Sequence, residues 1–91
     1  SPSAPHHVLV IPKGAYVTYD HFAAEASEAE IVDYTRAVGQ VCAQLGVDPG
    51  AGGGGYRMIS NAGDHGVQEV PHLHVHILAG RNIGRMIEKQ G

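Results

Sequence analysis

The sequence predicts an α+β domain in which an antiparallel sheet packs against one long helix. Two patterns carry this prediction. Apolar residues recur at helical spacing between Ile31 and Leu45, which is typical of a helix that buries one face. Histidines alternate with aliphatic residues over 72–78, which is typical of a strand with one apolar face. Strands on both sides of a single long helix in the chain favour one layer of helix on one sheet.

The segment before the long helix predicts a short strand and a helical turn. Val8–Ile11 is a continuous apolar run that Pro12 ends. Because this run does not alternate with polar residues, it predicts a strand that is buried on both faces. Residues 20–24 are expected to form one helical turn.

The long helix has signals at both ends. Ser27 and Glu30 fit a capping box, in which each side chain accepts a hydrogen bond from the backbone N–H of the other residue. Gly46 suits the end of the helix. Gly39 in the interior costs roughly 1 kcal/mol relative to alanine, which we interpret as a sign of close contact with the sheet. Cys42 is the single cysteine and falls on the apolar face, so we expect a buried thiol and no disulfide framework.

The segments after the helix complete the predicted sheet. The glycine-rich stretch 50–55 follows a helix and lacks a Lys-Ser/Thr pair, so it is interpreted as a connector and not as a phosphate-binding loop. We expect a strand over 56–60 and a tight turn over 61–66 that leads to the histidine strand. A terminal helix is expected over 81–89.

Length and charge narrow the function classes. The 91 residues predict a single domain over 1–91, and so short a chain buries only about 60% of its unfolded surface, which an oligomer would improve. The net charge is −3 and the six Lys and Arg residues are scattered, which argues against a nucleic-acid partner. No apolar run reaches the roughly 20 residues of a membrane span, and the first residues do not resemble a signal peptide. These features and the lone cysteine predict a cytoplasmic protein without a membrane partner.

The histidine strand is the strongest functional signal. His72, His74 and His76 point to one face of such a strand, and the aliphatic residues between them point to the other. At roughly 3.3 Å per residue, the outer two Cα atoms are about 13 Å apart. Neighbouring rings can therefore serve one reacting atom, whereas all three can hardly hold one metal ion. The pattern favours nucleophilic and acid–base chemistry by histidine.

Three motifs resemble the histidine triad (HIT) superfamily. Residues 72–78 match its His-φ-His-φ-His-φ-φ signature, and Ala79-Gly80-Arg81 resembles the Gly-Gly-Arg that closes the motif in the Hint branch. Residues 1–13 resemble that branch's Ser-Pro-x-Ala-Pro-x-His-φ-φ-φ-Ile-Pro-Lys, and residues 55–63 fit in the expected order. The resemblance covers residues 1–81 and implies a HIT-like antiparallel sheet packed with one long helix, with an interface shared in a homodimer.

The resemblance also implies a reaction. Hint-like enzymes cleave a nucleoside 5′-monophosphate from an amine or similar leaving group through a covalent nucleotidyl-histidine, and they need no cofactor. His74 matches the nucleophile, and His76 matches the residue that contacts the phosphate and helps to protonate the leaving group. His7 matches a fourth histidine that braces the site. The backbone near His72 is the implied acceptor that sets the tautomer of His74.

Other positions have weaker matches. Asn61 resembles a residue that hydrogen-bonds the nucleotide, although an asparagine that only makes a turn is the alternative. Gln68 and the backbone of residues 67–69 lie where the family forms a phosphate-binding loop. Val67 replaces the usual glycine there, and Glu69 replaces the usual serine. A carboxylate beside the leaving group would attract an amine, so these departures bear on substrate choice.

Three further histidines match no family position. His6, His21 and His65 are expected to be solvated. In addition, family members begin earlier, with a helix and a strand hairpin that supply the base pocket. The sequence therefore corresponds to the C-terminal part of the family domain, and the N-terminal helix and hairpin are absent from it. A purine nucleotide or nucleoside phosphoramidate is the implied substrate, but the leaving group and the base preference stay open.

Two alternative functions remain at this point. A His-x-His pair on a strand with a third histidine on a neighbouring strand is a common zinc geometry, and His74, His76 and His7 are candidates for such ligands. The other alternative is a nucleotide-binding module with weak turnover.

Overall fold

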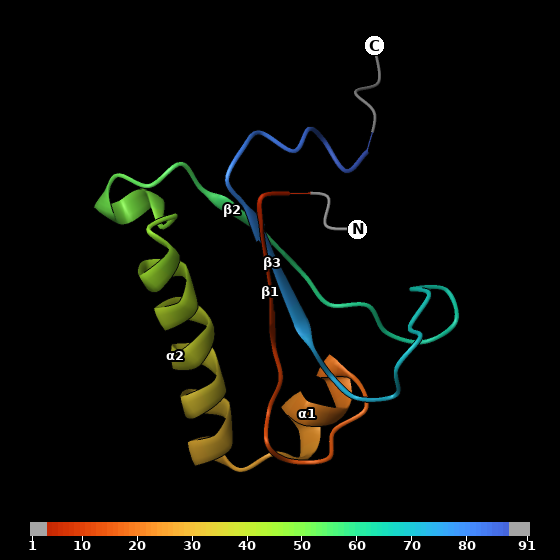
Figure 1. The fold of residues 1–91 in the computed structure, drawn as a ribbon. Helices are drawn as coiled ribbons and strands as arrows, with labels where there is room; N and C mark the ends of the chain where they lie inside the picture. Colours follow the sequence, from red (N-terminus) through yellow and green to blue (C-terminus); the bar gives the residue numbers. More distant parts are fainter. Residues whose placement is uncertain (1–3, 88–91) are drawn as a thin grey trace.

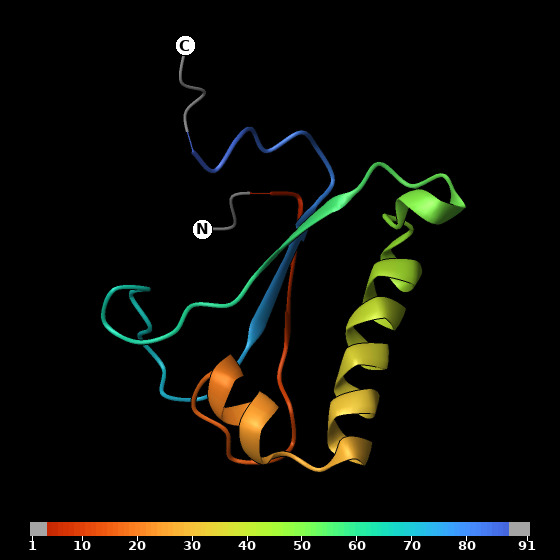
Figure 2. The ribbon, with the colours of Figure 1, turned by 180° about the vertical axis from the view of Figure 1, so that it is seen from behind.

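The computed structural model describes residues 4–87. Its elements are, in order, β1 (His6–Val10), α1 (Tyr19–Glu25), α2 (Glu28–Leu45), the 3-10 helix η1 (Pro49–Ala51), β2 (Tyr56–Ile59) and β3 (Val75–Ala79). The three strands form one antiparallel sheet in the order β1-β3-β2. Figures 1 and 2 show that α2 runs alongside this sheet and that α1 lies at the end where β1 finishes and β3 begins. The predicted α+β architecture is confirmed.

The core forms between the helices and one face of the sheet. The aliphatic residues that alternate with the histidines are buried there, with Leu73, Val75 and Ile77 each at most 2% exposed. They pack with side chains from both helices, namely Phe22, Tyr34 and Cys42. The predicted burial of the Cys42 thiol, which is unpaired, is confirmed.

The prediction that the first strand is buried on both faces is wrong. Val10 faces the core, where it is paired with Val75, but Leu9 is 50% exposed and Ile11 is 54% exposed. The physical reason is that helical side chains cover a single face of the sheet and that β1 lies at its edge. Leu9 instead shares the uncovered face with His76, its partner in the β1–β3 register.

The helix ends are confirmed. The Glu30 N–H donates to Ser27 Oγ at 3.1 Å, and the Ser27 N–H donates to Glu30 Oε1 at 3.0 Å. Gly46 ends the helix in the left-handed conformation, at φ 70°. Gly39, however, lies on the exposed side, and no atom beyond its chain neighbours and the adjoining helix backbone lies within 4 Å of the place where a Cβ would stand. The inferred contact between Gly39 and the sheet is therefore wrong, because the sheet packs against the opposite side of α2.

The short first helix is confirmed and is slightly longer than predicted, since α1 covers Tyr19–Glu25 with Thr18 as its N-cap. Strand β2 is also confirmed, and the glycine-rich stretch before it forms a connector with one 3-10 turn. The predicted turn is present over 63–67, where the Val67 N–H donates to the Asp64 oxygen at 3.1 Å and the Gln68 N–H donates to the Gly63 oxygen at 3.0 Å. It does not join the two strands directly, however. Residues 60–74 form a long connection, since the chain bends over 70–72 and the histidine strand begins only at Val75.

The predicted terminal helix is absent over 81–87, and residues 88 and 89 lie outside the described part. Asn82 Oδ1 accepts a hydrogen bond from the Gly84 N–H at 2.9 Å. Such a local bond competes with helical backbone bonding, and Gly84 has a φ of 77°, which a helix does not allow. Within residues 4–87, no helix is long and apolar enough to cross a membrane.

Candidate active site

Three histidine rings meet on the uncovered face of the sheet. The ring centroids of His74 and His76 are 4.9 Å apart, and those of His7 and His76 are 5.1 Å apart. β1 supplies His7 and β3 supplies His76, whereas His74 lies in the segment just before β3. The buried aliphatic row behind this segment fixes its backbone. The structure therefore brings together three of the four histidines that the sequence singled out.

The fourth predicted histidine has a different place. His72 Nε2 lies 3.3 Å from the carbonyl oxygen of Pro12, beyond the end of β1. Because a carbonyl oxygen only accepts, His72 Nε2 must carry the proton of this bond. The His72 ring thus anchors its segment to the end of β1, and its backbone carbonyl is the part that reaches His74.

That carbonyl sets the tautomer of His74. His74 Nδ1 lies 2.9 Å from the His72 oxygen, so Nδ1 is the donor and carries the ring's proton. In the neutral ring, Nε2 then keeps a free lone pair. Ser60 Oγ also donates to the His74 carbonyl oxygen at 3.2 Å. The arrangement presents an oriented imidazole nitrogen that can attack an electrophile.

The environment of His76 favours its neutral form. Burial lowers the pKa of His76 below its ordinary value, and the neighbouring charges of His74 and His7 lower it further. His76 Nδ1 lies 2.8 Å from His7 Nε2, so one of these two nitrogens donates to the other. When His7 Nε2 donates, the proton of His76 stands on Nε2, where it can be given to a ligand.

The lowered pKa of His76 predicts a pH effect on stability. As the pH falls below the ordinary value of 6.5, the unfolded chain takes up a proton at this residue before the folded protein does. The stability that neutral His76 contributes is thus complete above pH 6.5 and is lost as the pH falls through the folded pKa. In His76→Gln, chemical unfolding on both sides of pH 6.5 should show a smaller loss of stability in acid. His65→Gln, at an exposed residue, is the control and should follow the wild type. Identical curves for His76→Gln and the wild type would contradict the prediction.

The predicted substrate-binding residues all lie on the connection 60–74. The side chains of Asn61, Val67 and Glu69 are exposed. The amide of Gln68 is engaged in the protein: Oε1 accepts from the Gly63 N–H at 3.0 Å, and Nε2 donates to the carbonyl oxygens of Val17 and Val70 at 2.6 and 3.1 Å. The Gln68 side chain therefore shapes this connection.

Val67 is strained. Its φ is 55°, in the left-handed region that β-branched residues rarely adopt, and such strain costs of order 1–3 kcal/mol. Glycine adopts this conformation without strain. The backbone of the connection thus has at Val67 a form suited to the glycine that the resemblance implies there.

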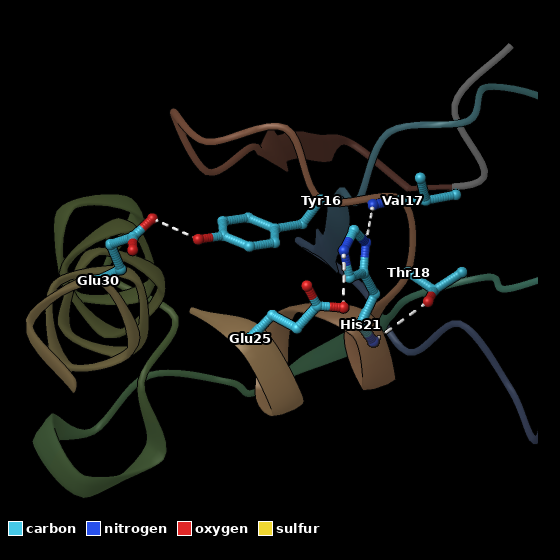
Figure 3. Close-up of polar contacts among 6 residues, drawn as sticks. All are labelled: Tyr16, Val17, Thr18, His21, Glu25 and Glu30. Carbon is cyan, nitrogen blue, oxygen red and sulfur yellow. Dashed lines mark hydrogen bonds and ion pairs between the residues drawn. The ribbon is translucent and has the colours of Figure 1, made fainter. Parts of the chain in front are cut away.

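His21 is a residue that the sequence reasoning missed. It was expected to be a solvated loop histidine, but it lies in α1, where its Nδ1 accepts from the Val17 N–H at 3.0 Å and its Nε2 lies 3.4 Å from Glu25 Oε2 (Figure 3). Its ring meets the edge of Tyr16, whose hydroxyl donates to Glu30 at 2.7 Å. The spacing of His21 and Glu25 in a helix was an available signal. The hydrogen bond from the Val17 N–H to His21 could not be predicted, because no sequence pattern indicates it. His6 and His65 are exposed, as expected.

Comparisons with known proteins identify the family. The HIT domain family model matches residues 1–83. An uncharacterised 13.2 kDa HIT-like protein of Azospirillum brasilense is 55% identical over 98% of this chain and 70% of its own length. A purine nucleoside phosphoramidase of Escherichia coli is 37% identical over the whole of this chain and 72% of its own length. A 14 kDa zinc-binding protein of Zea mays is 39% identical over 91% of this chain and 62% of its own length.

The fold comparison gives the same result. The solved structure of a histidine triad protein from Clostridium difficile superposes with a TM-score of 0.73 at 34% identity, over 99% of this chain and 71% of the other. The match of the family model covers nearly the whole chain, and the relatives exceed 30% identity over most of their length. The chain therefore belongs to the HIT domain family.

Proposed function

We propose that this protein cleaves a nucleoside 5′-monophosphate from an amine leaving group, with His74 as the nucleophile. The observation that carries the proposal is the bond from His74 Nδ1 to the His72 carbonyl at 2.9 Å, because it leaves Nε2 unprotonated. His76 stands beside it, with ring centroids 4.9 Å apart. The relation to a purine nucleoside phosphoramidase supports a phosphoramidate of a purine nucleoside as the substrate.

The reaction needs a protonated His76. Burial and its histidine neighbours keep this ring neutral in the free protein, but the negative phosphate of a substrate placed against it favours the imidazolium. Substrate binding is therefore coupled to uptake of a proton at His76. In the imidazolium both ring nitrogens carry protons, so His76 Nδ1 then donates to His7 Nε2, 2.8 Å away, and the proton of the neutral His7 ring stands on its Nδ1.

The chemistry then has two steps. His74 Nε2 attacks phosphorus, the new N–P bond forms, and the P–N bond to the leaving group breaks. The electron pair of the broken bond stays on the amine, and the proton of His76 completes the neutral amine. Water then attacks phosphorus, gives a proton to His76, and displaces Nε2. Nucleoside monophosphate is released and both histidines return to their state in the complex.

The connection 60–74 is proposed to bind the substrate. Backbone N–H groups of residues 67–69 would contact the phosphate, and Asn61 would hydrogen-bond the nucleotide. Glu69 is exposed near the start of the histidine segment, where its carboxylate would favour leaving groups that carry an amine. The strained backbone of Val67 supports the view that this connection is shaped for a ligand.

A homodimer is part of the proposal. Tyr56 and Met58 on the edge strand β2 pair with Ala79 and Ile77 of the core face, yet they are 47% and 56% exposed. Val32 on α2 is also exposed. An apolar edge of this kind next to a helix is suited to a second copy of the chain.

One of the similar proteins, the 14 kDa zinc-binding protein of Zea mays, supports the alternative that this protein binds zinc. The geometry gives it little support. His7 Nε2 and His76 Nδ1 share one hydrogen bond, and His74 Nδ1 is bound to a carbonyl. No group of three or more His, Cys, Asp or Glu side chains in residues 4–87 is arranged to hold a metal ion.

An assay on adenosine 5′-phosphoramidate, with and without EDTA, tests the proposal against this alternative. We expect release of AMP and ammonia at the same rate in both conditions, because every group in the proposed reaction belongs to the protein, the substrate or water and none is a metal ion. Metal content measured on the same sample should be far below one ion per chain. Stoichiometric zinc with activity that EDTA removes would contradict the proposal, as would the absence of turnover.

A further inference from the structure

Two peptide groups connect His74 with His21. The His72–Leu73 peptide accepts from His74 Nδ1 through its oxygen at 2.9 Å, and its N–H, that of Leu73, donates to the Tyr16 oxygen at 2.7 Å. The Tyr16–Val17 peptide continues the chain, since its N–H, that of Val17, donates to His21 Nδ1 at 3.0 Å. Figure 3 shows the last part of this path, with His21 between the Val17 nitrogen and Glu25.

We infer that His21 is a positioning residue for His74 and acts through these two peptide groups. The expected effect of His21 on turnover rests on the proposed function. Its expected effect on the hydrogen bonds of Val17, Leu73 and His74 does not. The basis of the inference is that all three bonds run in one direction, from the His74 ring to the His21 ring. His21 ends the path as an acceptor, so its Nδ1 must be unprotonated.

The common direction has a physical consequence. Hydrogen bonds in a chain polarise one another and become stronger. The bond from Val17 to His21 makes the Tyr16 oxygen a better acceptor for Leu73, and that bond makes the His72 oxygen a better acceptor for His74. The path therefore fixes the orientation of His74 and favours the tautomer with a free Nε2 lone pair.

Glu25 holds the far end of the path. His21 Nε2 lies 3.4 Å from Glu25 Oε2, which favours the proton on Nε2 and so leaves Nδ1 free to accept. His21 is also held at its own backbone, where its N–H donates to Thr18 Oγ1 at 3.3 Å as part of the α1 N-cap. The ring contact with Tyr16 restricts its rotation further.

The same segment supports the proposed phosphate-binding connection. The Val17 oxygen accepts from Gln68 Nε2 at 2.6 Å, and Gln68 Oε1 accepts from the Gly63 N–H. Tyr16 is thus bonded to Leu73, between the histidines, and Val17 is bonded to Gln68, in the proposed phosphate-binding part of the connection. The bond of the Val17 oxygen to Gln68 does not depend on the bond of the Val17 N–H to His21, so the connection is expected to keep its shape in a variant that lacks only the acceptor of His21.

Two substitutions separate the acceptor role of His21 from its packing. His21→Phe keeps an aromatic ring against Tyr16 but removes the acceptor, whereas His21→Asn places an amide oxygen near the position of Nδ1. Glu25→Gln, at an exposed side chain, is the matched control for the contact between His21 and the Glu25 carboxylate alone. The readouts are amide hydrogen exchange at Val17 and Leu73, the ¹⁵N chemical shifts of the His74 ring, and steady-state kinetics on adenosine 5′-phosphoramidate.

In His21→Phe we expect exchange at Val17 and Leu73 to rise by about tenfold and the His74 ring shifts to move toward a mixture of tautomers. We expect kcat to fall by about five- to tenfold with KM nearly unchanged, because a misplaced reacting group slows the chemical step. His21→Asn should stay close to the wild type in all readouts, and Glu25→Gln should change kcat by less than about twofold.

Exchange and ring shifts are measured without substrate, so they test the inference even if the wild type does not turn over the phosphoramidate. That result would contradict the proposed function and leave the inference to be decided by exchange. Unchanged exchange in His21→Phe would overturn the inference. So would equal losses in His21→Phe and His21→Asn, or an active protein in which exchange rises and kcat does not fall.

Discussion

Replacing His74 by Ala or Asn is expected to lower kcat for adenosine 5′-phosphoramidate by about four orders of magnitude or more, the size of loss seen when a nucleophile is removed. Without Nε2 no covalent nucleotidyl intermediate can form. The fold should survive, because the His74 side chain is not part of the core, which takes up Leu73 and Val75 on either side of it.

Mass spectrometry of protein quenched without acid checks the same prediction. A nucleotidyl adduct should appear on the wild type and be absent from His74→Ala. His6→Ala, at an exposed histidine outside the proposed substrate-binding connection, is the matched control and should keep both adduct and turnover. An adduct mapped to His72 or His76 would show that the nucleophile is another ring.

Replacing Ile77 by Ala is expected to lower the free energy of unfolding by about 3–4 kcal/mol. Ile77 lies on the central strand and is 0% exposed, so its removal leaves a cavity that the surrounding helices and strands cannot easily close. The loss is a large part of the 5–15 kcal/mol that typically stabilises a domain. Urea unfolding followed by circular dichroism measures it.

Leu9→Ala is the control for this experiment. Leu9 is also an aliphatic strand residue, but it is 50% exposed on the uncovered face, so its loss should cost less than about 1 kcal/mol. If the two variants lose similar stability, the face that carries Leu9 and His76 is not solvent-exposed in solution and the assignment of the core must be revised.

Several features of the fold were predictable because their causes are local. The capping box of Ser27 and Glu30 and the left-handed Gly46 are interactions within one turn of helix, and both ends of α2 match the prediction. The alternation of histidines and aliphatic residues reflects the period of an extended chain. It predicted correctly that Leu73, Val75 and Ile77 are buried.

Other features depend on contacts that no local pattern contains. One face of β1 is exposed because the helices pack only against the other face. An apolar run such as Val8–Ile11 has the same sequence pattern whether one face of the strand is buried or both are. The predicted terminal helix is not formed over 81–87. A local hydrogen bond from the Gly84 N–H to Asn82 Oδ1 is present there instead. The chain bends over 70–72 and its strand begins only at Val75, so the histidine strand is shorter than its alternation suggests.

By itself, the sequence determined the family and the alternation of histidines with buried aliphatic residues, because motif order and side-chain period are properties of the chain. Only the tertiary structure decided how these residues are connected. It places His7 against His76 across two strands, turns the ring of His72 toward Pro12, and joins His74 to His21 through two peptide groups. Hydrogen bonds between backbone groups carry no residue-type signature, so a path of this kind is invisible until the chain is folded.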